Sequence, residues 1–250
     1  MVESIHRFSS RVDTYVRFRP SYPKQIIHTL ERECRFTRDS TVADIASGTG
    51  IFTKLLLEHG NRVFGVEPNA EMRRAGEEFL AAYPNFISVT GTAEATALES
   101  YSVDFVTAAQ AGHWFDRQRS RQEFARILKP GGWAVLIWNE RKTDSTPFLR
   151  DYEKMLLRYG TDYKEVRHEH TVVIEFFDPC QFQERVFELQ QIFNYEGVEG
   201  RLLSSSYAPQ PGHPNHAPML RELRRIFDLH QQRGRVNIEY TTRMFYGQLA

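Results

Sequence analysis

From about residue 40 onward, the apolar positions alternate between short continuous runs and helix-like stripes. The run 41–46 is β-prone, and residues 51–59 carry apolar side chains at positions 51, 52, 55 and 56 before Gly60. A strand followed by an amphipathic helix that ends at glycine gives this pattern. The next unit repeats it, with a strand over 62–66 and a helix that Asn69 caps. The chain therefore begins its main fold with two strand–turn–helix units.

Further strands are predicted over 86–89, 103–108 and 133–138. Ser120 and Glu123 have the spacing of a capping box, which predicts a helix that opens at Ser120 and stops at Pro130-Gly131-Gly132. Strands and helices that alternate through short loops predict parallel β-α-β units. The fold class is therefore α/β, an open and mostly parallel sheet with helices on both faces.

The two flanks of this region have a different character. Residues 1–37 combine a turn-rich run at 19–23 with an apolar stripe at Ile26, Ile27 and Leu30, which predicts a cap or lid on the core at 38–140. Residues 141–250 are predicted to complete the sheet and to form a cap on the substrate side. The elements expected there are a helix from Thr146-Pro147, a strand over 187–195, a loop over 204–215, a helix over 219–230 and a last, antiparallel strand over 236–245.

Composition narrows the class of partner. The chain has 250 residues, 41% of them hydrophobic and 26% charged, which fits one globular core and excludes a disordered or fibrous protein. Basic and acidic residues number 32 each, so no net charge draws in nucleic acid or an anionic membrane. No apolar run is long enough to span a membrane, the first ten residues lack a signal-peptide pattern, and Cys34 and Cys180 form no CxxC pair. We therefore expect a cytoplasmic protein, a monomer or homodimer, with a small-molecule partner.

Candidate chemistry lies in the loops that follow the strands, because ligands of open parallel sheets bind at the carboxyl ends of the strands. After the first strand, Gly48 and Gly50 allow a tight turn at a helix N-terminus. Glu67 follows the second strand, where a carboxylate can accept hydrogen bonds from both hydroxyls of a ribose. Met72 either covers an adenine face or belongs to the core stripe of its helix. The spacing predicts a nucleoside site.

The chain resembles the class I S-adenosylmethionine-dependent methyltransferases, within the small-molecule (type 11-like) group. The resemblance rests on the glycine loop 44–50, the ribose segment 63–68, the turn Gly91-Thr92-Ala93-Glu94, the strand 103–108 and the run 126–132. It extends over roughly residues 40 to 140, and more faintly to 19–23 and the C-terminal strands. It implies a Rossmann-like sheet of seven strands, S-adenosylmethionine as cofactor with S-adenosylhomocysteine as product, and methyl transfer to a small organic acceptor.

The resemblance also implies roles for individual residues. The residues expected to bind the cofactor are Tyr15, Arg19, Asp44, Ala46, Ser47, Gly48, Gly50, Glu67, Pro68, Met72, Thr92, Ala93, Glu94, Gln110 and Ala111. Those expected on the substrate side are Phe18, Tyr22, His113, Trp114, Trp138 and Asn139. Within the first set, Glu67 would hold the ribose. Tyr15 and Arg19 would close over the methionine end, unless the N-terminal segment only covers apolar sheet surface.

Two positions depart from the family pattern. Ala46 replaces the first glycine of the loop, which is compatible with the motif provided that its φ stays below zero. Thr92 stands where the family often has an acidic residue for the adenine amino group, so either Thr92 or Glu94 must accept that hydrogen bond.

Other interpretations compete with methyl transfer. A nicotinamide-dependent oxidoreductase also uses a glycine turn and a ribose carboxylate, but Thr53 occupies its third glycine position. A non-catalytic cofactor-binding protein on the same fold is a further alternative. His113 either acts as a general base or only hydrogen-bonds within an aromatic wall. The remaining histidines that could suggest a metal, with possible oxygen ligands, lie in polar loops, and no metal is expected: His168, Glu169, His170, Glu175, Asp178, His213 and His216.

Overall fold

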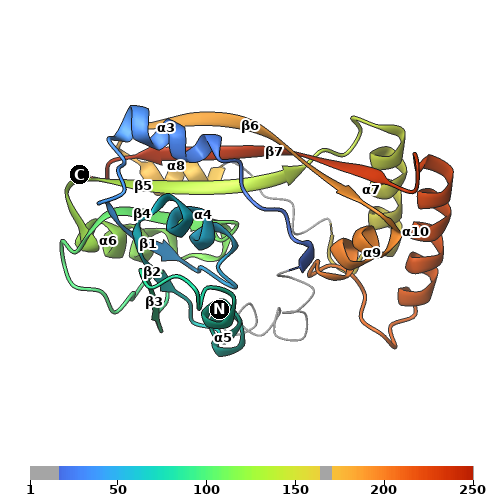
Figure 1. The fold of residues 1–250 in the computed structure, drawn as a ribbon, viewed down its shortest axis with the longest axis horizontal. Coiled ribbons are helices and arrows are strands. Elements are labelled where there is room, and N and C mark those ends of the chain that lie inside the picture. Colours follow the sequence, from blue (N-terminus) through green and yellow to red (C-terminus); the bar gives the residue numbers. More distant parts are fainter. Residues whose placement is uncertain (1–16, 164–170, 250) are drawn as a thin grey trace.

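The computed structural model describes residues 17–163 and 171–249. Within these ranges, seven strands form one sheet in the order β3-β2-β1-β4-β5-β7-β6 (Figure 1). The strands are β1 (Thr41–Ile45), β2 (Arg62–Val66), β3 (Phe86–Val89), β4 (Val103–Ala109), β5 (Leu128–Arg141), β6 (Phe182–Phe193) and β7 (Val236–Gly247). Strands β1 to β5 pair in parallel, whereas β7 runs antiparallel to both β5 and β6. The predicted α/β fold, mostly parallel with an antiparallel last strand, is confirmed.

Helices cover both faces of the sheet because the side chains of each strand alternate between them. On β5, Val135 and Ile137 face one core, whereas Ala134, Leu136 and Trp138 face the other. The first core is closed by α3 (Gln25–Cys34), α4 (Ile51–His59) and the end of α5 (Ala70–Phe79). The second is closed by α6 (Arg117–Ile127) and α8 (Thr171–Phe177), and the short 3-10 helix η2 (Gly112–Trp114) follows β4.

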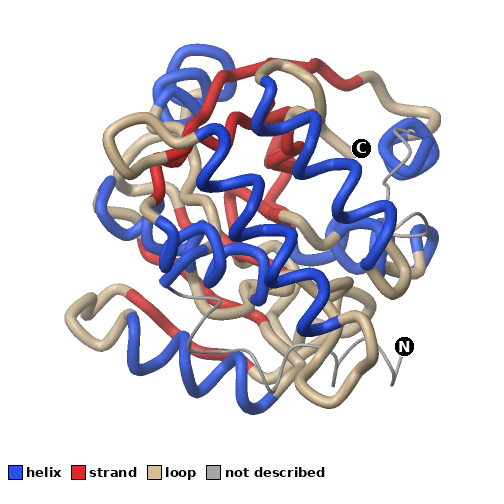
Figure 2. Tube along the Cα trace, turned by 90° about the vertical axis from the view of Figure 1, so that its right-hand side faces the viewer, coloured by secondary structure: helices blue, strands red, loops and turns tan. Residues whose placement is uncertain are grey.

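A third apolar core lies beyond the carboxyl end of β5. The helices α7 (Pro147–Tyr159), α9 (Tyr195–Leu203) and α10 (His216–His230) pack there against the adjoining ends of β6 and β7. Figure 1 shows this unit at the right-hand end of the sheet, and in Figure 2, viewed from that end, helices lie in front of the strands. We name α7, α9 and α10 the helical end unit. All three helices belong to residues 141–250, for which the sequence predicts a cap on the substrate side.

Several predicted boundaries were wrong. Helix α6 begins at Arg117 rather than Ser120, because the Asp116 side chain caps it by accepting a hydrogen bond from the Arg119 N–H. Ser120 and Glu123 therefore lie inside the helix, and Glu123 accepts hydrogen bonds from Thr96 instead. Strand β5 begins at Leu128 and continues through Pro130-Gly131-Gly132, and β6 covers 182–193 rather than 187–195.

Other local predictions were right, and two α-helices, α8 and α9, were missed. Asn69 caps α5 and Thr146 caps α7 through their side chains, as their positions predicted. Helix α9 was not predicted, because Gly197 and Gly200 give its sequence the composition of a turn. It forms because Asn194 caps it and because Val198 and Leu202 are buried in the third core.

Candidate functional site

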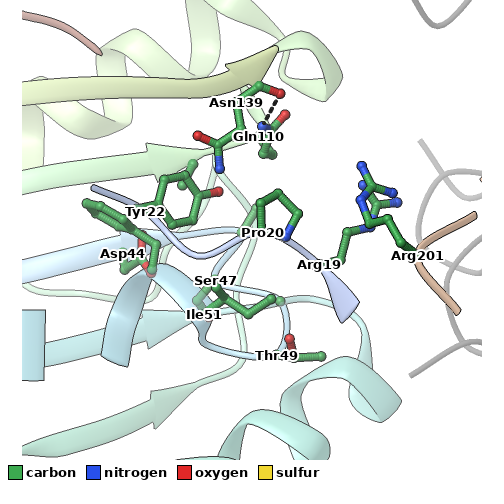
Figure 3. Close-up of a pocket in the computed structure, with 14 residues that line it drawn as sticks. Arg19, Pro20, Tyr22, Asp44, Ser47, Thr49, Ile51, Gln110, Asn139 and Arg201 are labelled. Carbon is green, nitrogen blue, oxygen red and sulfur yellow. Dashed lines mark hydrogen bonds between the residues drawn. The ribbon is translucent and has the colours of Figure 1, made fainter. Parts of the chain in front are cut away.

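The strand order reverses between β1 and β4, and ligands of open α/β sheets bind at such a switch point. The chain proceeds from β1 outward to β3 and then returns to β4 on the other side of β1. A pocket lies at this point, between the loop after β1 and the N-terminal segment (Figure 3). Of the predicted residues, Arg19, Tyr22, Asp44, Ala46, Ser47, Gly48, Gln110 and Asn139 line it. Residues that were not predicted also line it: Pro20, Thr49, Ile51, Phe52, Ala109 and Arg201.

The loop after β1 turns through three residues with positive φ. Ala46 has φ 54°, Gly48 57° and Gly50 82°. The expectation that Ala46 keeps φ below zero was therefore wrong. The chain must turn at once after β1 so that the Ser47 N–H can donate to the Val66 carbonyl at 3.2 Å. An alanine in this left-handed region is strained by contact of its Cβ with the backbone, by about 1–2 kcal/mol.

Asp44 anchors this loop from inside the protein. Its carboxylate accepts hydrogen bonds from the Thr53 hydroxyl of α4 at 2.6 Å and from the Thr107 hydroxyl of β4 at 2.8 Å. Burial raises the pKa of Asp44 to about 6, against the lowering effect of these two hydrogen bonds. One side chain thus joins β1, α4 and β4 beneath the pocket.

Glu67 supports the glycine loop from the end of β2. One carboxylate oxygen accepts from the Gly48 N–H at 2.9 Å and the other from the Asn69 N–H at 2.8 Å. The residue is only 7% exposed, and burial raises its pKa while these backbone donors lower it. Each oxygen keeps a further lone pair, because a carboxylate accepts about four hydrogen bonds. The carboxylate therefore keeps acceptor capacity beyond the two loop contacts, although Glu67 is not among the residues that line the pocket.

Met72 and the turn after β3 lie near this end of the site. The Met72 methyl carbon lies 3.4 Å from the position that a Cβ on Gly48 would take, so Met72 packs against the glycine loop. Backbone hydrogen bonds between Thr92 and Ala95 close the turn, and Ala93 within it is buried. The Glu94 carboxylate accepts from the Asp116 N–H at 2.9 Å. Pro68 is half-buried next to Glu67.

The N-terminal segment passes over the pocket and is fastened to the rest of the protein. The Tyr22 ring meets the Phe52 ring edge-on at 5.0 Å, and the Asn139 amide donates to the Ser21 carbonyl at 3.0 Å. An Arg19 Nη donates to the Ser204 carbonyl just after α9, at 2.8 Å. Tyr15 lies outside the described residues.

The other residues expected on the substrate side do not line the pocket. Phe18 packs against α9 at Gly200, and His113 and Trp114 lie together in η2 with ring centroids 4.6 Å apart. Trp138 faces the second core next to Gly112, because its side chain alternates with that of Ile137. Ala111, expected near the methionine, is buried just before η2. Gln110 lines the pocket and donates its amide N–H to the Asn139 carbonyl at 3.0 Å, which joins the ends of β4 and β5.

Arg201 is the charged residue among the six pocket residues that the sequence did not indicate. It belongs to α9, one of the unpredicted helices, and no motif surrounds it. Its Nε donates to the Tyr240 hydroxyl at 3.0 Å and one Nη to the Ser205 hydroxyl at 2.9 Å. The sequence offers one signal for Arg201. It is a basic residue within 141–250, the part of the chain for which a cap on the substrate side is predicted.

The suggested metal ligands are not gathered in the part of the chain that the structure describes. No group of three or more His, Cys, Asp or Glu side chains is placed there to hold a metal ion. The His216 ring nitrogen hydrogen-bonds the Pro209 carbonyl, and Glu175 pairs with Arg117, whereas His168, Glu169 and His170 lie outside the described residues. None of the described helices is long and apolar enough to cross a membrane.

Comparisons with known proteins agree with this geometry. Residues 43–136 match a family model described as a methyltransferase domain. An uncharacterized methyltransferase of Mycobacterium tuberculosis is 42% identical over 158 residues, which is 63% of this chain and 62% of that protein. A Saccharomyces cerevisiae protein named as a probable S-adenosylmethionine-dependent methyltransferase is 31% identical over 123 residues, which is 47% of this chain and 42% of that protein. The matches thus span less than two thirds of these relatives.

One solved structure extends the likeness to nearly the whole fold. A protein of Anaeromyxobacter dehalogenans, named provisionally as a type II methyltransferase, superimposes with a TM-score of 0.71 at 22% identity. The superposition covers 93% of this chain and 98% of the other. At this identity the likeness concerns the fold, including the helical end unit that the family model leaves out.

Proposed function

We propose that the protein is a class I, S-adenosylmethionine-dependent methyltransferase that transfers a methyl group to a small organic acceptor, because residues 43–136 match a methyltransferase domain and the similar proteins are named methyltransferases. The observation that carries the proposal is the contact between Glu67 and Gly48. It places a buried carboxylate, with acceptor capacity left, at the glycine turn where family members bind an adenosine.

The residues present fit such a cofactor. The adenosine end would lie by Glu67, with its ribose hydroxyls donating to the carboxylate and Met72 on one face of the base. The methionine end would lie along Ala46, Ser47 and Gly48, which line the pocket. Arg19 would bind the cofactor carboxylate, as a guanidinium fork suits that group.

The cofactor supplies an already activated methyl group on its sulfonium, so the protein has mainly to position and to exclude water. Asp44 keeps the loop in place, and Gln110 and Asn139 hold the ends of β4 and β5 at the pocket. Tyr22 and Pro20 cover the pocket from the N-terminal segment. His113 remains a candidate base for an acceptor that must lose a proton.

We further propose that the acceptor is neither a nucleic acid nor a lipid of a membrane surface. The balance of 32 basic and 32 acidic residues provides no attraction to a polyanion. We expect the protein to act in the cytoplasm as a monomer or homodimer.

A ligand comparison by thermal shift tests the proposed function. S-adenosylmethionine and S-adenosylhomocysteine should each raise the Tm, because a ligand that binds only the folded state stabilises it. Oxidised and reduced nicotinamide dinucleotides should leave the Tm unchanged. The reverse pattern would replace methyl transfer by a hydride-transfer function.

A further inference from the structure

Arg201 carries a buried positive charge that no carboxylate of the described chain neutralises. It is 6% exposed, and its hydrogen-bond acceptors are two hydroxyl groups, those of Tyr240 and Ser205. The nearby Arg141 differs, because it pairs with the Glu153 carboxylate. A buried charge without a counter-charge is costly to the folded state. Such a cation at a pocket is therefore better explained by a ligand than by stability.

The guanidinium of Arg201 faces the pocket. It lies beside Arg19, on the side away from Asp44 and Ser47 (Figure 3). The pocket thus has two unlike sides, with the glycine loop on one and two guanidinium groups on the other. Arg201 comes from the helical end unit, outside the residues 43–136 that match the methyltransferase domain.

The surroundings of Arg201 are positive and rich in tyrosine. Burial raises the pKa of Tyr207, but the positive charges of Arg201 and Arg141 outweigh this effect, so the pKa lies below its usual value. The positive charges that act on Tyr207 include those of Arg201, Arg141 and Arg19, and the Glu153 carboxylate is already paired to Arg141. Positive charge therefore remains for a ligand.

We propose that Arg201 binds a carboxylate of the methyl acceptor, so that the acceptor is a small carboxylic acid. This inference rests on the proposed function. The planar guanidinium fork matches a carboxylate, and hydroxyl groups already occupy its Nε and one Nη. The other Nη is left for one carboxylate group at the pocket wall. The proposed function assigns Arg19 to the cofactor's own carboxylate.

The test uses the full chain saturated with S-adenosylhomocysteine. Succinate and citrate are the probes, succinamide is the uncharged match for succinate, and inorganic phosphate is the other anion. At least one of the two acids should raise the Tm of the wild type, whereas succinamide and phosphate should not. In Arg201→Met the Kd for that acid should rise about 10- to 100-fold, the effect of losing a hydrogen bond to a charged group. The Kd for S-adenosylhomocysteine should stay unchanged.

Two stability measurements separate this role from a structural one. Both hydroxyl partners of Arg201 keep another contact, since the Tyr240 hydroxyl donates to Gln191 at 2.8 Å and the Ser205 hydroxyl reaches the residue 201 carbonyl at 3.4 Å. Ligand-free Arg201→Met should therefore keep or raise the Tm. Arg141→Met is the matched control and should lower it, because the buried Glu153 carboxylate would lose the positive charge that pairs with it.

Several results would overturn the inference. If neither acid raises the wild-type Tm, or if only phosphate raises it, a carboxylate acceptor at this position is excluded. Arg201→Met weakening S-adenosylhomocysteine as strongly as Arg19→Ala would assign the charge to the cofactor. A fall in Tm like that of Arg141→Met would make Arg201 structural. Failure of the wild type to bind S-adenosylhomocysteine at all would instead refute the proposed function.

Discussion

Ala46 is an alanine at a backbone position that favours glycine. Its φ of 54° is accessible to glycine at little cost and to alanine only with strain. Replacing Ala46 by Gly should raise the free energy of unfolding of the ligand-free protein by about 0.5–1 kcal/mol, once the greater freedom of glycine in the unfolded chain is subtracted from the relieved strain. Urea denaturation measures this difference.

Ala43→Gly is the matched control, because Ala43 is buried in β1 and is not among the residues with positive φ. That variant should lose stability, since glycine weakens a strand. Equal losses in the two variants would mean that the turn at Ala46 carries no strain.

Asp44 predicts a pH dependence of stability. Burial raises its pKa from 3.8 to about 6 in the folded protein, so the folded state binds more protons than the unfolded state between these values. The free energy of unfolding, relative to that of Asp44→Asn, should therefore fall by about 2 kcal/mol as the pH rises from 4 to 6, and by about 3 kcal/mol in all before it levels off near pH 7. Denaturation of both proteins across this range gives the difference, and a difference that rises with pH would contradict the burial argument.

For single residues, the sequence allowed us to predict which ones follow strands, but not which contacts they make. Gly48 and Glu67 were found because their positions after β1 and β2 are set by chain order. The hydrogen bond between them could not be foreseen, since it depends on the loop's positive φ angles. Arg201 could not be distinguished from the other basic residues of 141–250, because tertiary packing of α9 places it at the pocket.

Among the elements, α9 connects the N-terminal segment to the pocket. A Cβ on Gly200 would lie 2.3 Å from a ring carbon of Phe18, the neighbour of Arg19. Gly200→Ala should therefore lower the free energy of unfolding by about 1–3 kcal/mol, the usual cost of overpacking, despite the better helix propensity of alanine.

A double-mutant cycle with Phe18→Ala checks this packing. In the Phe18→Ala background the same glycine substitution should be neutral or stabilising, because the clash is gone. An undiminished cost in that background would show that Phe18 does not limit the space at Gly200.

Regular alternation made the first five strands and three of the helices predictable. The pattern of β1 to β5 with α4, α5 and α6 follows hydrophobic period and capping chemistry, which are local. The end unit was harder, because α9 has weak propensity and is stabilised by burial of Val198 and Leu202 in the third core. The start of α6 was misplaced because two residues there, Asp116 and Ser120, have side chains that can cap a helix. Asp116 is the one that does so.

For the whole molecule, the proposed function draws its cofactor side and its acceptor side from different parts of the chain. Residues 43–136, which match the methyltransferase family model, contain the glycine loop and Glu67. The N-terminal segment and the helical end unit contain Arg19, Tyr22 and Arg201. General motifs of the family specify the first half and not the second. This explains why the sequence predicts the cofactor and leaves the acceptor open.

The most direct test of the account is a calorimetric titration with S-adenosylhomocysteine. The wild type should bind one molecule per chain, and Glu67→Ala should bind more weakly by about 1.5–3 kcal/mol, the range for a hydrogen bond to a charged group. Glu78 is an exposed carboxylate in α5, the helix that follows Glu67 in the chain. Glu78→Ala should therefore bind as the wild type does. Unchanged affinity in a folded Glu67→Ala protein, or no binding by the wild type, would contradict the central claim.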